Sequence, residues 1–136
     1  MQLKIKLLPG GHIPRKAHET DAAYDLVAAT VDYGNEYVEY DCAFQIAIPE
    51  GFCGLIYPRS SVSNKNMHLC NSVGVIDASY RGSVKVRFYR RGQDFYMPGE
   101  RVAQLMIVPT LSVEFEQVDS LDVTDRGAGS FGSSGT

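Results

Sequence analysis

Apolar and polar side chains alternate with a period of two along much of this 136-residue chain. The pattern is clearest in three segments, at residues 3–7, 44–48 and 84–88. Successive side chains of a β-strand point to opposite faces, so this alternation predicts strands with one buried face. No segment keeps the 3.6-residue period of an amphipathic helix over ten residues.

Turn-forming sequences separate these segments, at residues 9–11, 33–35, 49–51, 91–93 and 97–99. Further apolar segments, at residues 54–57, 102–108 and 111–118, bring the expected total to about eight to ten short strands. One short helix is expected around residues 61–66, with Ser60 as its candidate N-cap. The chain is therefore predicted to fold as one all-β domain, a barrel or a sandwich.

The last eleven residues, RGAGSFGSSGT, differ from the rest, because Phe131 is their one large apolar side chain. In isolation this Gly- and Ser-rich composition predicts a disordered tail. The same composition suits a segment whose backbone must wrap closely around phosphate groups. The residues alone leave both interpretations open.

Charge and hydropathy exclude two kinds of partner. A formal net charge of −3 provides no broad basic surface, so tight non-specific binding to nucleic acid is not expected. No run approaches the roughly 20 apolar residues that span a bilayer, and the N-terminal residues do not form a secretion signal. We therefore expect a cytoplasmic protein, of a cell or of a virus-infected host, that needs neither nucleic acid nor membrane.

The spacing of cysteine and histidine argues against a metal held directly by side chains. Cys42, Cys53 and Cys70 form no CxxC pair and fit neither a zinc site nor a disulfide framework. We expect three reduced cysteines inside strands. The histidines, at positions 12, 18 and 68, also lack ligand spacing.

The segment at residues 58–65 combines a strand end, a cation and two hydroxyls. Arg59, Ser60 and Ser61 precede the expected helix, and backbone N–H groups at a helix start bind anions together with such donors. Taken alone, the segment also fits an ordinary capped turn.

A second polar cluster lies at residues 71–82. Asp77 follows an apolar strand, and Tyr80 comes three residues later, before a glycine turn. In a hairpin this spacing sets a carboxylate and a ring around one small ligand, with the carboxylate as general base toward a water. A turn-capping Asp and a half-buried Tyr would give the same pattern.

Two polar residues stand in apolar surroundings. Asp25 in AAYDL should bond backbone groups or a basic partner, and a link to the water shell of a metal is the sharper alternative. Gln104 in RVAQL must find partners if it is buried, and these can be structural.

In their joint order, these segments resemble the five motifs of the trimeric dUTPase family. The motifs are AAYDL (22–26), PRSS (58–61), GVIDASYRG (74–82), RVAQL (101–105) and RGAGSFGSSG (126–135). The third and fifth are specific, whereas the first and fourth would mean little alone. The resemblance covers nearly the whole chain.

The resemblance implies a jelly-roll-like β-barrel or β-clip subunit with one short helix and a flexible C-terminal arm. Residues 1–125 would form the barrel. Residues 126–136 would form a mobile lid that closes the active site of a neighbouring subunit. Three such sites would lie between the subunits of a homotrimer.

The resemblance also assigns roles for the hydrolysis of dUTP to dUMP and pyrophosphate. Asp77 resembles the base that deprotonates the attacking water, and Tyr80 resembles the ring that packs under deoxyribose and excludes a 2′-hydroxyl. The hairpin backbone would read uracil, helped by the Asn71 amide. The remaining positions that match nucleotide-binding positions of the family are Arg59, Ser60, Ser61, Gly74, Val75, Ile76, Lys85, Gln104, Arg126, Phe131, Gly132 and Ser133.

Mg²⁺ is the implied cofactor, chelated by the three phosphates and by water. Asp25 would contact only the water molecules bound to the ion. This arrangement would explain why the sequence shows no cluster of metal ligands. Two departures from the family pattern stand out. Ser83 follows Gly82 where an acidic residue is common, and Ser130 replaces a glycine of the arm, where it would weaken closure if a positive φ is needed.

Three other functions remain to be weighed. A dCTP deaminase of the same superfamily would need a glutamate and an arginine arranged for deamination. A regulatory protein that keeps the fold without catalysis, as in some viral relatives, would be favoured by loss of Asp77, Tyr80 or Phe131, and all three are present. A purely structural β-sandwich explains the alternation but not PRSS or the C-terminal arm.

Overall fold

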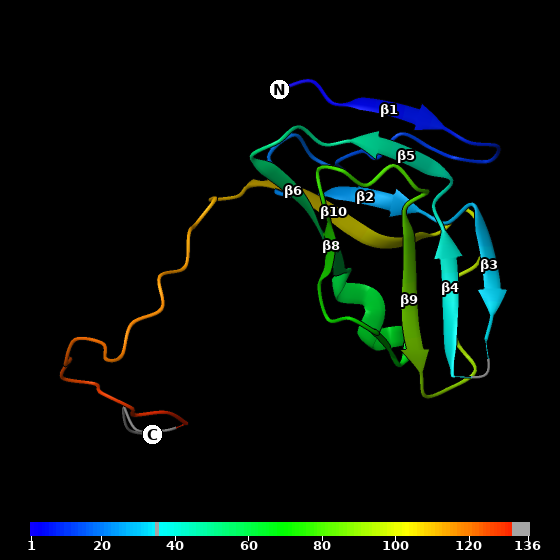
Figure 1. Ribbon diagram of the computed structural model, residues 1–136. Coiled ribbons are helices and arrows are strands. Elements are labelled where there is room, and N and C mark those ends of the chain that lie inside the picture. Colours follow the sequence, from blue (N-terminus) through cyan, green and yellow to red (C-terminus); the bar gives the residue numbers. More distant parts are fainter. Residues whose placement is uncertain (35, 132–136) are drawn as a thin grey trace.

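Ten β-strands and one short 3₁₀-helix make up the regular structure in the computed structural model, which describes residues 1–34 and 36–131 (Figure 1). One sheet has the order β2 (Tyr24–Val27), β10 (Arg101–Pro109), β6 (Phe52–Pro58), β8 (Gly74–Ile76). The other has the order β3 (Thr30–Tyr33), β4 (Tyr37–Asp41), β9 (Lys85–Arg90), β7 (Met67–Leu69). A separate pair joins β1 (Lys4–Leu7) to β5 (Phe44–Ala47).

Every strand pairing is antiparallel, and most hydrogen-bonded neighbours are distant in sequence. The chain passes from one of these two sheets to the other between β2 and β3 and again at every connection from β6 to β10. Such crossing connections between two antiparallel sheets give the jelly-roll-like architecture that was expected. The all-β prediction is confirmed.

The core follows the predicted alternation. Val84, Val86 and Phe88 are buried, while Lys85 and Arg87 between them are exposed. The segment at residues 44–48 behaves in the same way, with Phe44, Ile46 and Ile48 all buried. In contrast, the N-terminal segment is only partly covered, and Leu7 is exposed.

An aromatic cluster fills the centre of this core. Tyr40 packs edge-on against Phe88 and Tyr96, with both ring centroids 6.0 Å away. The hydroxyl of Tyr40 accepts the backbone N–H of Tyr96 at 2.9 Å. Burial raises the pKa of Tyr40 to about 12, so this hydroxyl stays neutral. The hydroxyl of Tyr96 is also buried, but no described residue hydrogen-bonds to it.

The short helix η1 (Ser60–Lys65) corrects one prediction. It is a 3₁₀-helix that begins one residue earlier than expected, with Arg59 as its N-cap, and no side chain caps it. Ser60 was therefore wrongly predicted as the N-cap. Arg59 keeps an extended conformation, and its carbonyl accepts the N–H of Val62 at 3.0 Å, which already closes the first turn.

The strand predicted at residues 111–118 is also wrong for the single chain. After the Thr110 N–H, which donates to the Gly51 carbonyl, the chain leaves the body and runs away from it (Figure 1). Leu111, Phe115 and Val123 are almost fully exposed. The alternation is present, but a strand also needs a neighbour to pair with, and no described edge of this chain supplies one.

All three cysteines are free, as expected. Cys53 lies inside β6, whereas Cys42 and Cys70 directly follow β4 and β7. Cys42 is buried, and burial raises its pKa to about 12. Among the described residues, no helix has the length and apolar character needed to cross a membrane.

Candidate active site

The connection from β7 through β8 to β9 encloses a cavity of about 180 Å³. Seven of the predicted site residues line this cavity: Asn71, Gly74, Val75, Ile76, Asp77, Tyr80 and Lys85. The structure therefore brings together the general base, the ring and the hairpin that were expected to surround a nucleoside. The lining is completed by Ile56 and Val84.

Local geometry explains why this hairpin takes its shape. The Tyr80 N–H donates to the Asp77 carbonyl at 3.0 Å, which closes a tight turn between the two residues. Gly74 lies on β8 opposite Ile56, and a Cβ there would lie 3.1 Å from the Ile56 Cβ. Glycine thus lets β8 pack closely on β6 and leaves the space beside Asn71 open.

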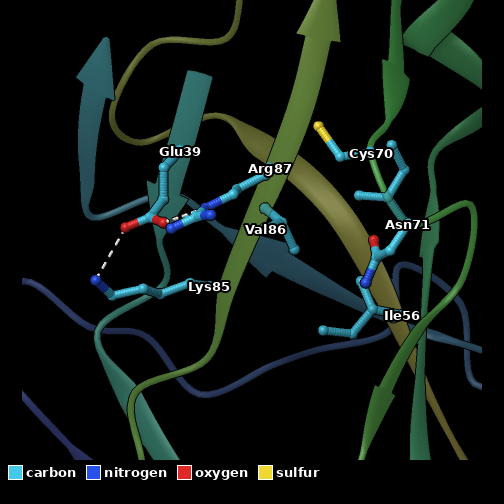
Figure 2. A pocket seen from close by; sticks show the side chains of 9 residues that line it. Glu39, Ile56, Cys70, Asn71, Lys85, Val86 and Arg87 are labelled. Atoms are coloured by element: carbon cyan, nitrogen blue, oxygen red, sulfur yellow. Dashed lines mark hydrogen bonds and ion pairs between the residues drawn. The ribbon is translucent and has the colours of Figure 1, made fainter. Parts of the chain in front are cut away.

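The cavity opens into a second hollow of about 470 Å³ along β9. Figure 2 shows Asn71 and Ile56 on one side of this hollow and Glu39, Lys85 and Arg87 on the other. The Glu39 carboxylate accepts Nζ–H of Lys85 at 2.9 Å and Nε–H of Arg87 at 2.6 Å. The two cations are thereby fixed along the edge of the hollow.

Glu39 was not predicted as part of the site. The hydrogen bond from Lys85, and then the one from Arg87, hold the pKa of Glu39 below its ordinary value. The same bonds raise the pKa of Lys85 and of Arg87. Two exposed cations on one face of β9 do signal an acidic partner on the neighbouring strand, but only the register identifies it, because Glu39 pairs with Arg87.

A separate cavity of about 610 Å³ holds four other predicted residues, namely Asp25, Arg59, Ser60 and Gln104. Asp25 accepts Nε–H of Arg59 at 2.9 Å and Nη1–H of Arg101 at 3.1 Å. The prediction of a basic partner for Asp25 is confirmed. No described residue accepts a hydrogen bond from the terminal nitrogens of Arg59, so they are available to an anion.

Gln104 has the structural partner that was considered for it. Its Nε2 donates to the Pro58 carbonyl at 3.0 Å, which ties β10 to the end of β6. Ser60 lines the cavity, whereas Ser61 is half-buried in η1 and is not part of the lining.

The two cavities lie on opposite faces of the β6 sheet and share no lining residue. Ile56 lines the Asp77 cavity and its neighbour Tyr57 lines the Arg59 cavity. Adjacent residues of a strand point to opposite faces, so one chain cannot bring Asp77 and Arg59 to the same small ligand. The two groups of predicted residues are therefore separate within one chain, and we call them the Asp77 half-site and the Arg59 half-site.

Residues 126–131, the part of the C-terminal arm that the structure describes, line neither cavity of their own chain. Arg126 donates from Nε to the Gly129 carbonyl at 3.1 Å, and Phe131 is fully exposed. Gly132 and Ser133, which were also predicted to bind nucleotide, lie outside the described residues. Figure 1 shows the chain after β10, as far as residue 131, running away from the two sheets.

The described residues contain no group of three or more His, Cys, Asp or Glu side chains arranged to hold a metal ion. Both carboxylate oxygens of Asp25 already face a guanidinium group. The donor set thus suits an ion that arrives on an anionic ligand with its own water, rather than one held in a cage of carboxylates.

Comparison with known proteins shows what this chain is similar to. A deoxyuridine 5'-triphosphate nucleotidohydrolase of Tropheryma whipplei is 39% identical over 137 residues, which cover 95% of this chain and 92% of that protein. The structure of Staphylococcus bacteriophage 80alpha dUTPase with dUpNHpp superimposes with a TM-score of 0.85 at 30% identity, covering 99% of both chains.

A second solved structure is a dUTPase variant from phage phi11 of S. aureus, described as showing the coordination of a structural Mg(II) ion. It matches with a TM-score of 0.74 at 27% identity and covers 88% of this chain and 98% of that one. The family model described as dUTPase matches residues 10–135. That span includes both cavities and the arm, and the chain therefore belongs to the dUTPase family.

Proposed function

We propose that this protein hydrolyses dUTP to dUMP and pyrophosphate. The observation that carries the proposal is the cavity of about 180 Å³ in which Asp77, Tyr80 and Asn71 lie together beside an open hairpin backbone. This is the set of groups that a deoxyuridine site needs: a base, a flat wall for the sugar and an amide for the uracil edge. Membership of the dUTPase family supports the same substrate.

Asp77 is the proposed general base. Its carboxylate lies at the end of β8 on the cavity wall, where it can take a proton from a water that attacks the α-phosphate. Negative charge then grows on the phosphate oxygens and on the leaving pyrophosphate. Cations and backbone N–H groups held in place beforehand stabilise that charge without rearrangement.

Arg59 is the proposed main cation for the phosphates. The Asp25 carboxylate holds its Nε and leaves the planar fork of the guanidinium directed at the cavity, a geometry suited to two phosphate oxygens. Ser60, Ser61, Gln104 and Lys85 are proposed to assist from the same half-site or from the β9 edge. Arg126, Phe131, Gly132 and Ser133 would act from the arm.

A homotrimer is the proposed assembly. Since one chain holds the Asp77 cavity and the Arg59 cavity on opposite faces, a complete site requires the Asp77 face of one subunit to meet the Arg59 face of another. Residues 110–125 add a second reason, because they combine almost fully exposed apolar side chains with five carboxylates and no Lys or Arg. Such a segment is stabilised by lying on another subunit.

Mg²⁺ is the proposed cofactor, brought in on the triphosphate. When bound, it would neutralise phosphate charge as the pyrophosphate leaves. Within the described residues, Asp21 and Asp25 are the carboxylates that line the Arg59 cavity, and both oxygens of Asp25 are engaged by guanidinium groups, so Asp25 would contact the ion through water.

The decisive experiment offers the protein dUTP, dCTP, UTP and dTTP with Mg²⁺ and measures pyrophosphate and the nucleoside product. Release from dUTP alone is expected, and Asp77→Asn should lower the rate about 10²–10⁴-fold. Asp94→Asn changes an exposed carboxylate of the β9–β10 connection and serves as the matched control. Deaminated product from dCTP, or no turnover of dUTP, would overturn the proposal.

A regulatory role is the second candidate. The structure of the bacteriophage 80alpha dUTPase is described with the words that phage dUTPases control transfer of virulence genes. That description concerns the phage protein. Here the presence of Asp77, Tyr80 and Asn71 on one cavity wall favours catalysis.

A further inference from the structure

We infer that Asp41 and Ser83 are positioning residues that fix the Tyr80 ring and thereby set how strictly the site distinguishes deoxyribose from ribose. The inference rests on the proposed function, because it assigns a task to the wall of that same cavity. Neither residue lines the cavity, so both would act through neighbours and not by touching the nucleotide. Ser83 reaches the site through Tyr80 alone, whereas Oδ2 of Asp41 also lies 3.9 Å from Nζ of Lys85, so Ser83→Ala is the variant that isolates the effect of the ring.

The first link is the anchor of the ring. The Tyr80 hydroxyl donates to the Ser83 carbonyl at 2.9 Å. Tyr80 is 45% exposed, so packing alone does not immobilise its ring. Among the described residues, this is the one hydrogen bond of the Tyr80 side chain, and the orientation of the ring therefore depends on where the Ser83 carbonyl lies.

The second link holds Ser83 itself. The Ser83 hydroxyl donates to Oδ1 of Asp41 at 2.5 Å, across 42 residues of sequence. The same oxygen accepts the backbone N–H of Ala43 at 2.7 Å, which fixes the carboxylate at the end of β4. Hydrogen bonds to an ionised acceptor are roughly twice as strong as neutral ones, so Asp41 is a firm anchor.

The intervening residues are also held. Gln45 donates from Nε2 to the Arg81 carbonyl at 2.7 Å, which joins the hairpin to β5. A Cβ on Gly82 would collide with the Tyr80 hydroxyl oxygen, so glycine allows the ring to fold back onto the loop. Hydrogen bonds thus hold the turn from Tyr80 to Ser83 at the Arg81 carbonyl and at the Ser83 hydroxyl, and the bond at Ser83 is made to the charged Asp41 carboxylate.

The consequence for specificity is steric. Exclusion of a 2′-hydroxyl requires the ring to stay within a few tenths of an ångström of the sugar, because a small shift opens room for one oxygen atom. Releasing Ser83 should therefore raise kcat/KM for UTP by more than it lowers kcat/KM for dUTP. A residue that only stabilises the fold would affect both nucleotides alike.

The test compares Asp41→Asn and Ser83→Ala with wild type by steady-state kinetics on dUTP and UTP. We expect the ratio of kcat/KM for dUTP over UTP to fall about 5- to 30-fold, corresponding to loss of a charge-assisted hydrogen bond. The change should appear mainly as a lower KM for UTP, with kcat and KM for dUTP within about twofold of wild type. Ser83→Thr keeps the hydroxyl and should restore the ratio.

Asp32→Asn is the matched control, since it removes an exposed carboxylate from the adjacent strand β3 and should leave the ratio unchanged. Calorimetric binding of dUpNHpp and its ribose counterpart gives a second readout that does not depend on catalysis. An unchanged ratio in folded Asp41→Asn and Ser83→Ala would overturn the inference while leaving the proposed function intact. Absence of dUTP turnover in wild type would overturn both.

Discussion

The Asp25 carboxylate accepts Nε–H of Arg59 at 2.9 Å, although the two residues are 34 positions apart in the sequence. Arg101 occupies the other carboxylate oxygen at 3.1 Å. A single mostly covered carboxylate thus aligns two guanidinium groups at the Arg59 half-site, where we propose that the phosphates bind. This ion pair orients the Arg59 guanidinium so that both terminal nitrogens can contact one phosphate group. The single ammonium group of a lysine cannot make these two parallel contacts.

Arg59→Lys tests this orientation. We expect KM for dUTP to rise about 10-fold, because the compact ammonium cannot hold two phosphate oxygens at once. Asp25→Asn should give a similar change, and the double variant should cost little more than either alone, since both remove the same alignment. Arg91→Lys, at an exposed turn, should match wild type. Fully additive effects would contradict a shared role.

Deletion of residues 126–136 tests the arm. It should lower kcat/KM for dUTP about 100-fold, because the deletion removes the segment that we propose as a lid that excludes water and adds donors around the phosphates. Phe131→Ala should reproduce part of this loss through KM. Sedimentation of the shortened chain should still give three times the mass of its own subunit. Full activity of the deletion would exclude the arm from catalysis.

Tyr40→Phe and Tyr96→Phe form a matched pair in the core. Tyr40→Phe should destabilise the fold by about 1–3 kcal/mol, because it leaves the buried Tyr96 N–H without its acceptor. Tyr96→Phe should be neutral or stabilising, since no described residue hydrogen-bonds to the hydroxyl that it removes. Urea denaturation of both variants measures the difference. Equal losses would show that the Tyr96 hydroxyl has a partner.

Glu39→Gln tests the ion-pair network through its pH dependence. The pKa of Glu39 is lowered on folding, so ionised Glu39 stabilises the fold above its ordinary value of 4.5. That stabilisation is lost as the pH falls through the lower folded-state value. The variant should therefore be less stable than wild type at pH 7, and the difference should shrink in acid. Glu50→Gln, in an exposed turn, should show no such dependence.

Much of the fold follows from the sequence because period-two alternation directly reports a strand with one covered face. The buried trio Val84, Val86 and Phe88 illustrates this. The same signal misleads at residues 111–118, where the pattern is present but the segment pairs with none of the described strands. Alternation specifies which face is apolar and does not specify what covers it.

The site divides in the same way. Asp77, Tyr80 and Asn71 were predictable as one cluster because one hairpin carries them all. The pairing of Asp25 with Arg59 was predictable only as a need for a basic partner, because the register of β2, β10 and β6 selects it. Glu39 and Asp41 carry no motif signal, since they act from β4 on groups that β9 and its preceding turn present.

Because Ile56 and Tyr57 point to opposite faces of the sheet, a lone chain would hold the proposed base Asp77 and the proposed phosphate-binding Arg59 where they could not act on the same nucleotide. Turnover per chain should then fall steeply on dilution, once subunits separate, without any inhibitor or covalent change. A newly synthesised monomer would therefore not hydrolyse dUTP until the concentration of chains is high enough for subunits to associate.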